Sequence, residues 1–105
     1  MLFHSTRGGD ANKTFEEVLM QGLADDGGLF MPNEWPQVDL NELKKQKSFI
    51  DVAKKIVPLY TSSSFDSSEV IDLLDNTWHD FSDENFAPIH RLNKYKSVLE
   101  LFHGP

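Results

Sequence analysis

The spacing of hydrophobic residues predicts three amphipathic helices. In the stretch TFEEVLMQGLA, residues 14–24, the apolar side chains recur at intervals of three and four residues, so they fall on one face of a helix. Two later stretches repeat this spacing. The apolar positions are Phe15, Val18, Leu19 and Leu23 in the first helix, Phe49, Val52, Ala53, Ile56 and Tyr60 in the second, and Val70, Ile71, Leu74 and Trp78 in the third.

Capping residues mark where the helices begin. A side chain that can cap a helix N-terminus is followed three residues later by an acidic residue in four pairs: Thr14–Glu17, Asp39–Glu42, Ser48–Asp51 and Asp66–Glu69. The second pair predicts a brief additional helix through Lys45. Pro58 lacks the N–H that would bond back one turn, so we expect the helix that starts at Ser48 to end or kink near Val57.

Short apolar runs between the helices predict strands. LFHSTRG, residues 2–8, reads as an edge strand that enters a turn at Gly8 and Gly9, and LFMP, residues 29–32, as an extended segment after a left-handed residue at Gly27 or Gly28. Residues 89–102 read as a hairpin that turns at 93–96. The predicted fold class is α+β: a small domain of three to four helices with a few short strands and a C-terminal β-hairpin.

Length and charge narrow the class of protein. The 105 residues fit one domain, 1–105, and no stretch approaches the run of about 18 apolar residues that a membrane span needs. The first residues show no secretory signal and there are no cysteines, so we expect a cytoplasmic protein without disulfides or thiolate metal sites. The lack of such an apolar run leads us to expect no membrane partner. The net charge of −7 repels a phosphate backbone, so we expect no nucleic-acid binding.

The polar residues give only weak signals for a metal site, a catalytic carboxylate pair or a phosphate site. The four histidines are dispersed at His4, His79, His90 and His103, without the spacing that places two imidazoles on one face, so we expect no metal site. The acidic pairs at 25–26 and 83–84 stand beside Gly or Ser and are typical of caps and turns. STRGG, residues 5–9, could bind a phosphate, but it lacks the spacing of a nucleotide-binding loop, and a turn is favoured.

Four stretches together resemble the N-terminal region of threonine synthase, in the same order and at matching spacing. They are STRG at 5–8, TFEEVLMQGLADDGGLFMP at 14–32, FAPI at 86–89 and LELFHGP at 99–105. Threonine synthase belongs to the fold-type II enzymes that use pyridoxal phosphate (PLP), and it converts O-phospho-L-homoserine and water to L-threonine and phosphate. The resemblance therefore implies a PLP-dependent carbon-oxygen lyase of threonine biosynthesis for the full-length protein.

The resemblance also implies that this chain is catalytically silent by itself. In the family, the last motif continues as H-G-P-T-x-A-F-K-D, and its lysine, about five residues past Pro105, binds the cofactor. None of the lysines considered stands in that motif: Lys44, Lys45, Lys47, Lys54, Lys55, Lys94 and Lys96. We therefore expect no catalytic residue and no bound cofactor in this chain, which would pack on its own catalytic domains in the intact enzyme.

Few site residues carry over from the resemblance. His103, Gly104 and Pro105 match the motif that leads into the cofactor lysine, which implies a place at the active-site rim. For His103, contact with substrate or cofactor and a structural hydrogen bond both remain open. Arg7, in the early motif, is a weak candidate for binding substrate. Two alternatives to threonine synthase also stay open: a threonine synthase-like phospholyase, which shares this region, and a stand-alone interaction domain without catalysis.

Overall fold

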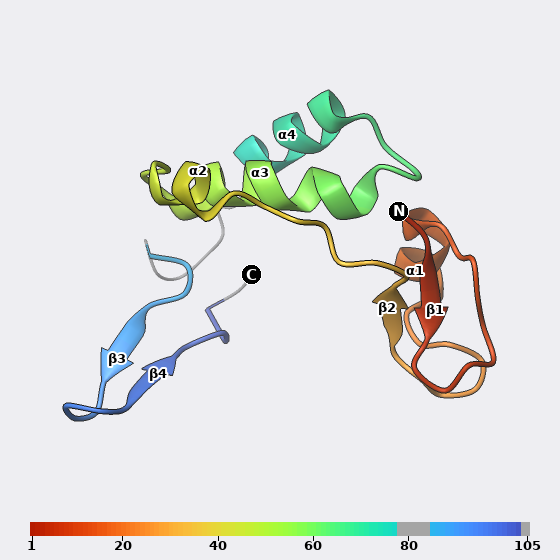
Figure 1. Ribbon diagram of the computed structural model, residues 1–105, viewed down its shortest axis with the longest axis horizontal. Coiled ribbons are helices and arrows are strands. Elements are labelled where there is room, and N and C mark those ends of the chain that lie inside the picture. The colour runs from red at the N-terminus through yellow and green to blue at the C-terminus, as the bar shows by residue number, and fades with distance from the viewer. Residues whose placement is uncertain (78–84, 104–105) are drawn as a thin grey trace.

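The computed structural model describes residues 1–77 and 85–103. Those residues form four helices and two antiparallel strand pairs, which confirms the predicted α+β class (Figure 1). Strands β1 and β2 lie with α1 at one end of the molecule, α2, α3 and α4 form a helical layer, and the β3–β4 hairpin extends from the other end. The bounds are β1 Phe3–Ser5, α1 Phe15–Gln21, β2 Phe30–Pro32, α2 Leu40–Lys44, α3 Phe49–Thr61, α4 Ser67–Asn76, β3 Ile89–Arg91 and β4 Ser97–Leu99.

The predicted capping residues start the helices. At α1 the Thr14 hydroxyl accepts from the Glu17 N–H at 3.3 Å, while the Glu17 carboxylate accepts from the Thr14 N–H at 2.7 Å. The hydrogen bond from the Thr14 backbone, and then the one from its hydroxyl, hold the pKa of Glu17 below its usual value. At α3 the Ser48 hydroxyl accepts from the Asp51 N–H at 3.0 Å. Each cap satisfies a backbone donor that the helix itself leaves without a partner.

Helix α1 is shorter than the sequence pattern predicts. It ends at Gln21 rather than near Ala24, because Gly22 adopts a φ of 76° and its N–H bonds back to the Val18 carbonyl at 2.9 Å. Only glycine takes this conformation at little cost, so the helix stops there. The predicted left-handed residue in the next turn is Gly27, with a φ of 74°.

Helix α3 does not end near Val57, one of the two outcomes expected there, because it passes through Pro58 and continues to Thr61. The proline removes one hydrogen bond, to the carbonyl one turn back, but α3 makes the largest helix contact of the described residues, with α4. Thr61, beyond the proline, is buried and its hydroxyl donates to the Val57 carbonyl at 3.4 Å. Packing therefore outweighs the local cost of Pro58. In the third predicted helix, Trp78 lies outside the described residues.

A row of aromatic rings joins the strand end of the molecule to the helical layer. The Phe15 ring centroid lies 6.2 Å from that of Phe3 on β1 and 6.2 Å from that of Phe65, which follows α3. The loop after α3 also accepts from the start of α1, with the Phe15 N–H bonded to the Ser63 hydroxyl at 3.1 Å. Aromatic packing and this hydrogen bond hold α1 against α3 and the loop that follows it.

The strands pair in two separate antiparallel ladders. In the first, Phe3 pairs with Pro32 and Ser5 with Phe30. In the second, Ile89 pairs with Leu99, so the predicted C-terminal hairpin is confirmed. None of the helices in the described ranges is long and apolar enough to cross a membrane.

The molecule exposes more surface than a self-contained domain of its size. Its accessible area is 7860 Å², whereas a compact monomer of 12.0 kDa exposes about 6,000 Å². Its radius of gyration is 16.1 Å, against about 13 Å for a compact chain of this length. Large apolar side chains make up part of the exposed surface, including Met20 at 81%, Tyr95 at 84% and Phe102 at 75%. Such a surface is typical of a polypeptide that packs against further protein.

Replacing the α1 cap tests how the N-terminal helix is held. Thr14→Ala removes the hydroxyl acceptor, so we expect it to lower the free energy of unfolding by about 1 kcal/mol. Urea denaturation followed by circular dichroism measures this change. Thr14→Ser keeps the hydroxyl and serves as the matched control, with stability close to that of the original chain. Equal losses for the two variants would show that the hydroxyl does not stabilise the helix.

Candidate functional site

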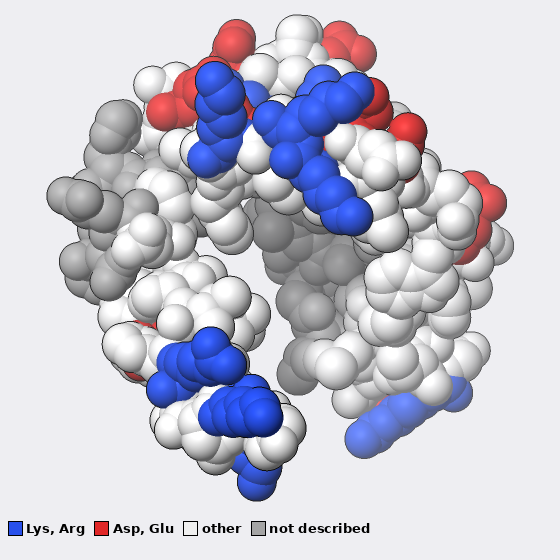
Figure 2. All heavy atoms as spheres, turned by 60° about the vertical axis from the view of Figure 1, so that its left-hand side comes forward, with Lys and Arg blue, Asp and Glu red and all other residues white. Residues whose placement is uncertain are grey.

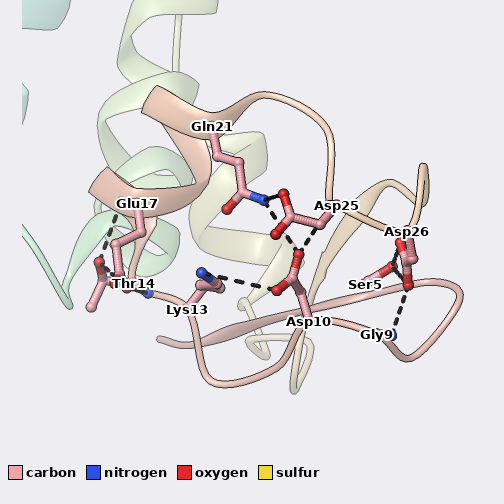
Figure 3. A network of polar contacts seen from close by, with 9 residues as sticks. All are labelled: Ser5, Gly9, Asp10, Lys13, Thr14, Glu17, Gln21, Asp25 and Asp26. Carbon is pink, nitrogen blue, oxygen red and sulfur yellow. Dashed lines mark hydrogen bonds and ion pairs between the residues drawn. The ribbon is translucent and has the colours of Figure 1, made fainter.

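The STRG stretch folds around one carboxylate, that of Asp26. Ser5, at the end of β1, is fully buried, and its hydroxyl lies 2.7 Å and 2.9 Å from the two carboxylate oxygens of Asp26. The same carboxylate accepts from the backbone N–H group of Gly9 at 2.7 Å (Figure 3) and from that of Gly28 at 2.8 Å. One side chain therefore ties the turn after β1 to the turn before β2.

These contacts hold the pKa of the Asp26 carboxyl below its ordinary range. The hydrogen bond from the Ser5 hydroxyl is the largest cause, followed by the one from the Gly28 N–H, because both favour the charged form. The Asp26 carboxylate is therefore a structural anion whose hydrogen-bonding capacity is used within the protein.

Two glycines make this close approach possible. A Cβ at Gly28 would overlap the Ser5 hydroxyl, and a Cβ at Gly9 would lie 2.6 Å from the nearer carboxylate oxygen of Asp26. Side chains at these positions would therefore displace the carboxylate. Glycine at these two positions therefore serves the packing of the turns.

The STRGG stretch forms the favoured turn, and its backbone donors are used inside the protein. The Arg7 N–H donates to the Ser5 hydroxyl at 3.1 Å, the Gly8 N–H to the Ser5 carbonyl at 3.0 Å, and the Gly9 N–H to Asp26. A phosphate-binding loop instead aims such donors at its ligand. Arg7 is exposed, and one guanidinium nitrogen donates to the Asp26 carbonyl at 2.9 Å. Its guanidinium is thus the charged group that this turn exposes.

The neighbouring acidic residues form a second network instead of a carboxylate pair with Asp26. The Asp10 carboxylate accepts from the Asp25 N–H at 3.0 Å and from the Gln21 side-chain amide at 3.3 Å, and it lies 4.0 Å from the Lys13 ammonium (Figure 3). Gln21 also donates to the Asp25 carboxylate at 3.1 Å. Asp25 and Asp26 therefore serve different hydrogen-bond networks, as expected for turn residues.

At the other end of the chain, the structure brings His103 and His90 together on Glu100. The Nε2 atom of His103 lies 2.6 Å from one carboxylate oxygen of Glu100, and the Nε2 atom of His90 lies 3.3 Å from the other. The His103 ring also packs beside that of Phe102, with 4.6 Å between centroids. Glu100 is not among the candidate residues predicted from the sequence. The three-residue spacing from Glu100 to His103 is a signal that could have found this contact.

The remaining predicted site residues lie elsewhere. Gly104 and Pro105, like His79, are outside the described residues. His4 bonds to the side chain of Asn33 at 2.9 Å. Within 1–77 and 85–103, no group of three His, Asp or Glu side chains is placed to hold a metal ion.

The described residues do not fit a PLP site. Binding PLP requires a lysine amine for its aldehyde and several donors for its phosphate. The Lys54 ammonium pairs with Asp75, and Lys55 borders a surface pocket together with Asp39 and Glu42, whose carboxylates repel a phosphate. The turn donors of the STRGG stretch are engaged internally. Neither a phosphate cradle nor a lysine beside one is formed by this part of the chain.

Comparison with known proteins shows the family. The family model described as "Threonine synthase N terminus" matches residues 2–78. The chain therefore belongs to the threonine synthase N-terminal family, as the sequence motifs predicted.

Relatives match the chain from end to end but are much longer than it is. Threonine synthase from Schizosaccharomyces pombe is 42% identical over 104 residues, which cover 96% of this chain and 20% of that protein. Threonine synthase-like 2 from Xenopus laevis is 38% identical, over 99% of this chain and 23% of that protein. The crystal structure of PLP-bound threonine synthase from Brucella melitensis matches with a TM-score of 0.76 and 30% identity, over 98% of this chain and 23% of that one. The chain spans about a fifth of the length of these proteins.

The low pKa of the Asp26 carboxyl predicts that the stability of the protein falls at acidic pH. Its pKa is lower in the folded state than in the unfolded chain, so its contribution to stability is present above about pH 4 and is lost as the pH falls through the folded value. We expect Asp26→Asn to reduce stability at pH 7 and to make the acid side of the stability–pH curve shallower. Denaturant midpoints from pH 7 down to about pH 2.5 measure this curve.

Asp25→Asn is the matched control, since the neighbouring carboxylate does not contact Ser5 or Gly28 in the described structure. It should leave the acid side of the curve close to that of the original chain. A curve for Asp26→Asn that runs parallel to the original down to the lowest pH would contradict the assigned role.

Proposed function

We propose that this chain is the N-terminal part of a threonine synthase, which converts O-phospho-L-homoserine and water to L-threonine and phosphate in the cytoplasm. The observation that carries the proposal is the end-to-end match to threonine synthases, of which the chain spans about a fifth. The FHGP motif at 102–105 supports it, since this motif leads into the family's cofactor lysine. Catalysis would then depend on a lysine in the protein that follows residue 105.

In the proposed enzyme, bound PLP supplies the electron sink for the reaction, and the residues of this chain supply structure around it. His103, Gly104 and Pro105 would lie at the active-site rim, where they connect this chain to the cofactor loop. Arg7 would offer its exposed guanidinium to a carboxylate or phosphate group on the catalytic domains or the substrate. The rigid turn built on Asp26 supports this proposal because it holds the backbone of Arg7 in one place.

The exposed apolar surface supports packing against the catalytic domains. The excess over a compact monomer is roughly 1,900 Å², which is comparable with one side of a large permanent interface. The hairpin is a clear case, because a two-stranded hairpin by itself is marginally stable in water and this one exposes Ile89, Val98 and Leu99. The family match ends at residue 78, before the hairpin. We therefore infer that the hairpin packs with the protein that follows.

A second candidate function is that of a threonine synthase-like phospholyase, which releases phosphate from the substrate without forming threonine. The chain is 38% identical to threonine synthase-like 2 from Xenopus laevis, and this similarity supports the second candidate function. The described residues serve both functions equally well, because the reaction would be directed from the catalytic domains. Threonine synthase is preferred on the match of 42% to the Schizosaccharomyces pombe enzyme.

Product analysis of the full-length protein tests this proposal. Incubated with PLP and O-phosphohomoserine, it should release phosphate and threonine in equal amounts, measured by a phosphate assay and amino-acid chromatography. The chain of residues 1–105 alone is the matched control and should form no product and no borohydride-trapped PLP adduct. Formation of 2-oxobutyrate in place of threonine would support the phospholyase. A stoichiometric specific PLP adduct on residues 1–105 would contradict the assignment of catalysis to the following domains.

A further inference from the structure

Glu100 holds two imidazoles at the point where the hairpin leads into the FHGP motif. Its carboxylate oxygens lie 2.6 Å from Nε2 of His103 and 3.3 Å from Nε2 of His90. His103 follows Glu100 by three residues, whereas His90 stands on the opposite strand of the hairpin. The carboxylate therefore joins the end of β4 to both the β3 strand and the segment that continues toward residue 105.

The hairpin itself fixes the position of the Glu100 backbone. The Glu100 N–H donates to the Pro88 carbonyl at 3.0 Å, just beyond the ladder in which Ile89 pairs with Leu99. The Glu100 side chain is 21% exposed and that of His103 is 18% exposed, so this contact is largely shielded from water. A hydrogen bond between an imidazole and a carboxylate gains strength in such surroundings.

The Glu100 carboxylate contacts two histidines, whereas the lysine and arginine side chains of the hairpin lie away from it. Glu100 is the single acidic residue in the stretch 85–103. The basic residues of the hairpin gather at its other end, near the turn between β3 and β4 (Figure 2). There the Arg91 guanidinium donates to the carbonyls of Asn93 and Lys94, at 3.3 Å and 3.4 Å. The Glu100 carboxylate is thus placed to act on the two imidazoles.

The His103 ring is held on two sides. Its Nε2 edge meets the Glu100 carboxylate, and its face packs beside the ring of Phe102 at a tilt of 34°. The Glu100 carboxylate accepts a hydrogen bond from the Nε2–H group of His103. This hydrogen bond fixes both the orientation of the ring and the nitrogen that carries the proton. A histidine held in this way presents its other nitrogen in a defined direction.

We propose that Glu100 is a positioning residue that orients the His103 imidazole at the active-site rim, with His90 bracing the carboxylate from the neighbouring strand. This inference rests on the proposed function for its catalytic consequence, but the contact itself does not. Loss of the carboxylate would free the His103 ring to rotate, and misplacement of a group beside the reacting atoms can slow an enzyme by as much as about 100-fold.

Proton NMR of the full-length protein, labelled with ¹⁵N-histidine, tests the contact directly. We expect a downfield, exchange-protected imidazole N–H signal that disappears in His103→Asn, which assigns it. Glu100→Ala should abolish this signal. Glu100→Gln keeps one carbonyl acceptor and should retain a weaker signal. Glu42→Gln, which removes the charge of another glutamate paired with a basic residue three positions away, is the matched control and should leave the signal unchanged.

Steady-state kinetics with O-phosphohomoserine test the consequence. We expect Glu100→Ala to lower kcat by between about 10-fold and 100-fold with a smaller change in KM, and Glu100→Gln to recover part of the loss. The proposal is overturned if the protected proton is absent from the original protein, persists in Glu100→Ala, or disappears without a change in kcat. A Glu100-dependent proton in a protein that makes neither threonine nor 2-oxobutyrate would refute the proposed function while leaving the contact intact.

Discussion

The carboxylate of Asp26 is the interaction on which the N-terminal part of the structure depends. It accepts from the buried Ser5 hydroxyl and from the backbone N–H groups of Gly9 and Gly28, which belong to two segments of the chain, the STRGG stretch and the turn before β2. A buried hydroxyl without a partner would be destabilising, and a fixed carboxylate supplies that partner. The contact joins the turns that flank β1 and β2 and thereby supports the pairing of these two short strands.

The two ends of the chain are stabilised in different ways. Around Asp26 the polar groups bond to one another, and Phe15 packs between Phe3 and Phe65. In the β3–β4 hairpin, by contrast, every strand residue is exposed, including Ile89 and Leu99, whereas Phe3 and Ser5 of β1 are buried. Membership of the threonine synthase N-terminal family, and relatives about five times as long as this chain, give this contrast a physical reason. The contacts of Asp26 and Phe15 stabilise the N-terminal part, whereas the hairpin would gain its stability from the protein that follows.

Local chemistry made the helix starts and the hairpin predictable from sequence. Thr14 and Ser48 cap helices through neighbours three residues away, so their role can be read from spacing alone. The end of α3 could not be read in this way, since packing on α4 outweighs the local cost of Pro58. The candidate site also depends on a contact between residues far apart in the sequence. Ser5 and Asp26 are 21 positions apart, and the sequence does not reveal that their side chains meet.

Amide hydrogen exchange of the same residues, alone and within the full-length protein, tests the central claim most directly. In the isolated chain, we expect protection at Gly9 and Gly28, whose N–H groups bond to Asp26, and rapid exchange at Leu92 and Glu100 in the hairpin. In the full-length protein all four amides should be protected. Equal protection of the hairpin in both forms would contradict the claim that its stability comes from packing against the catalytic domains.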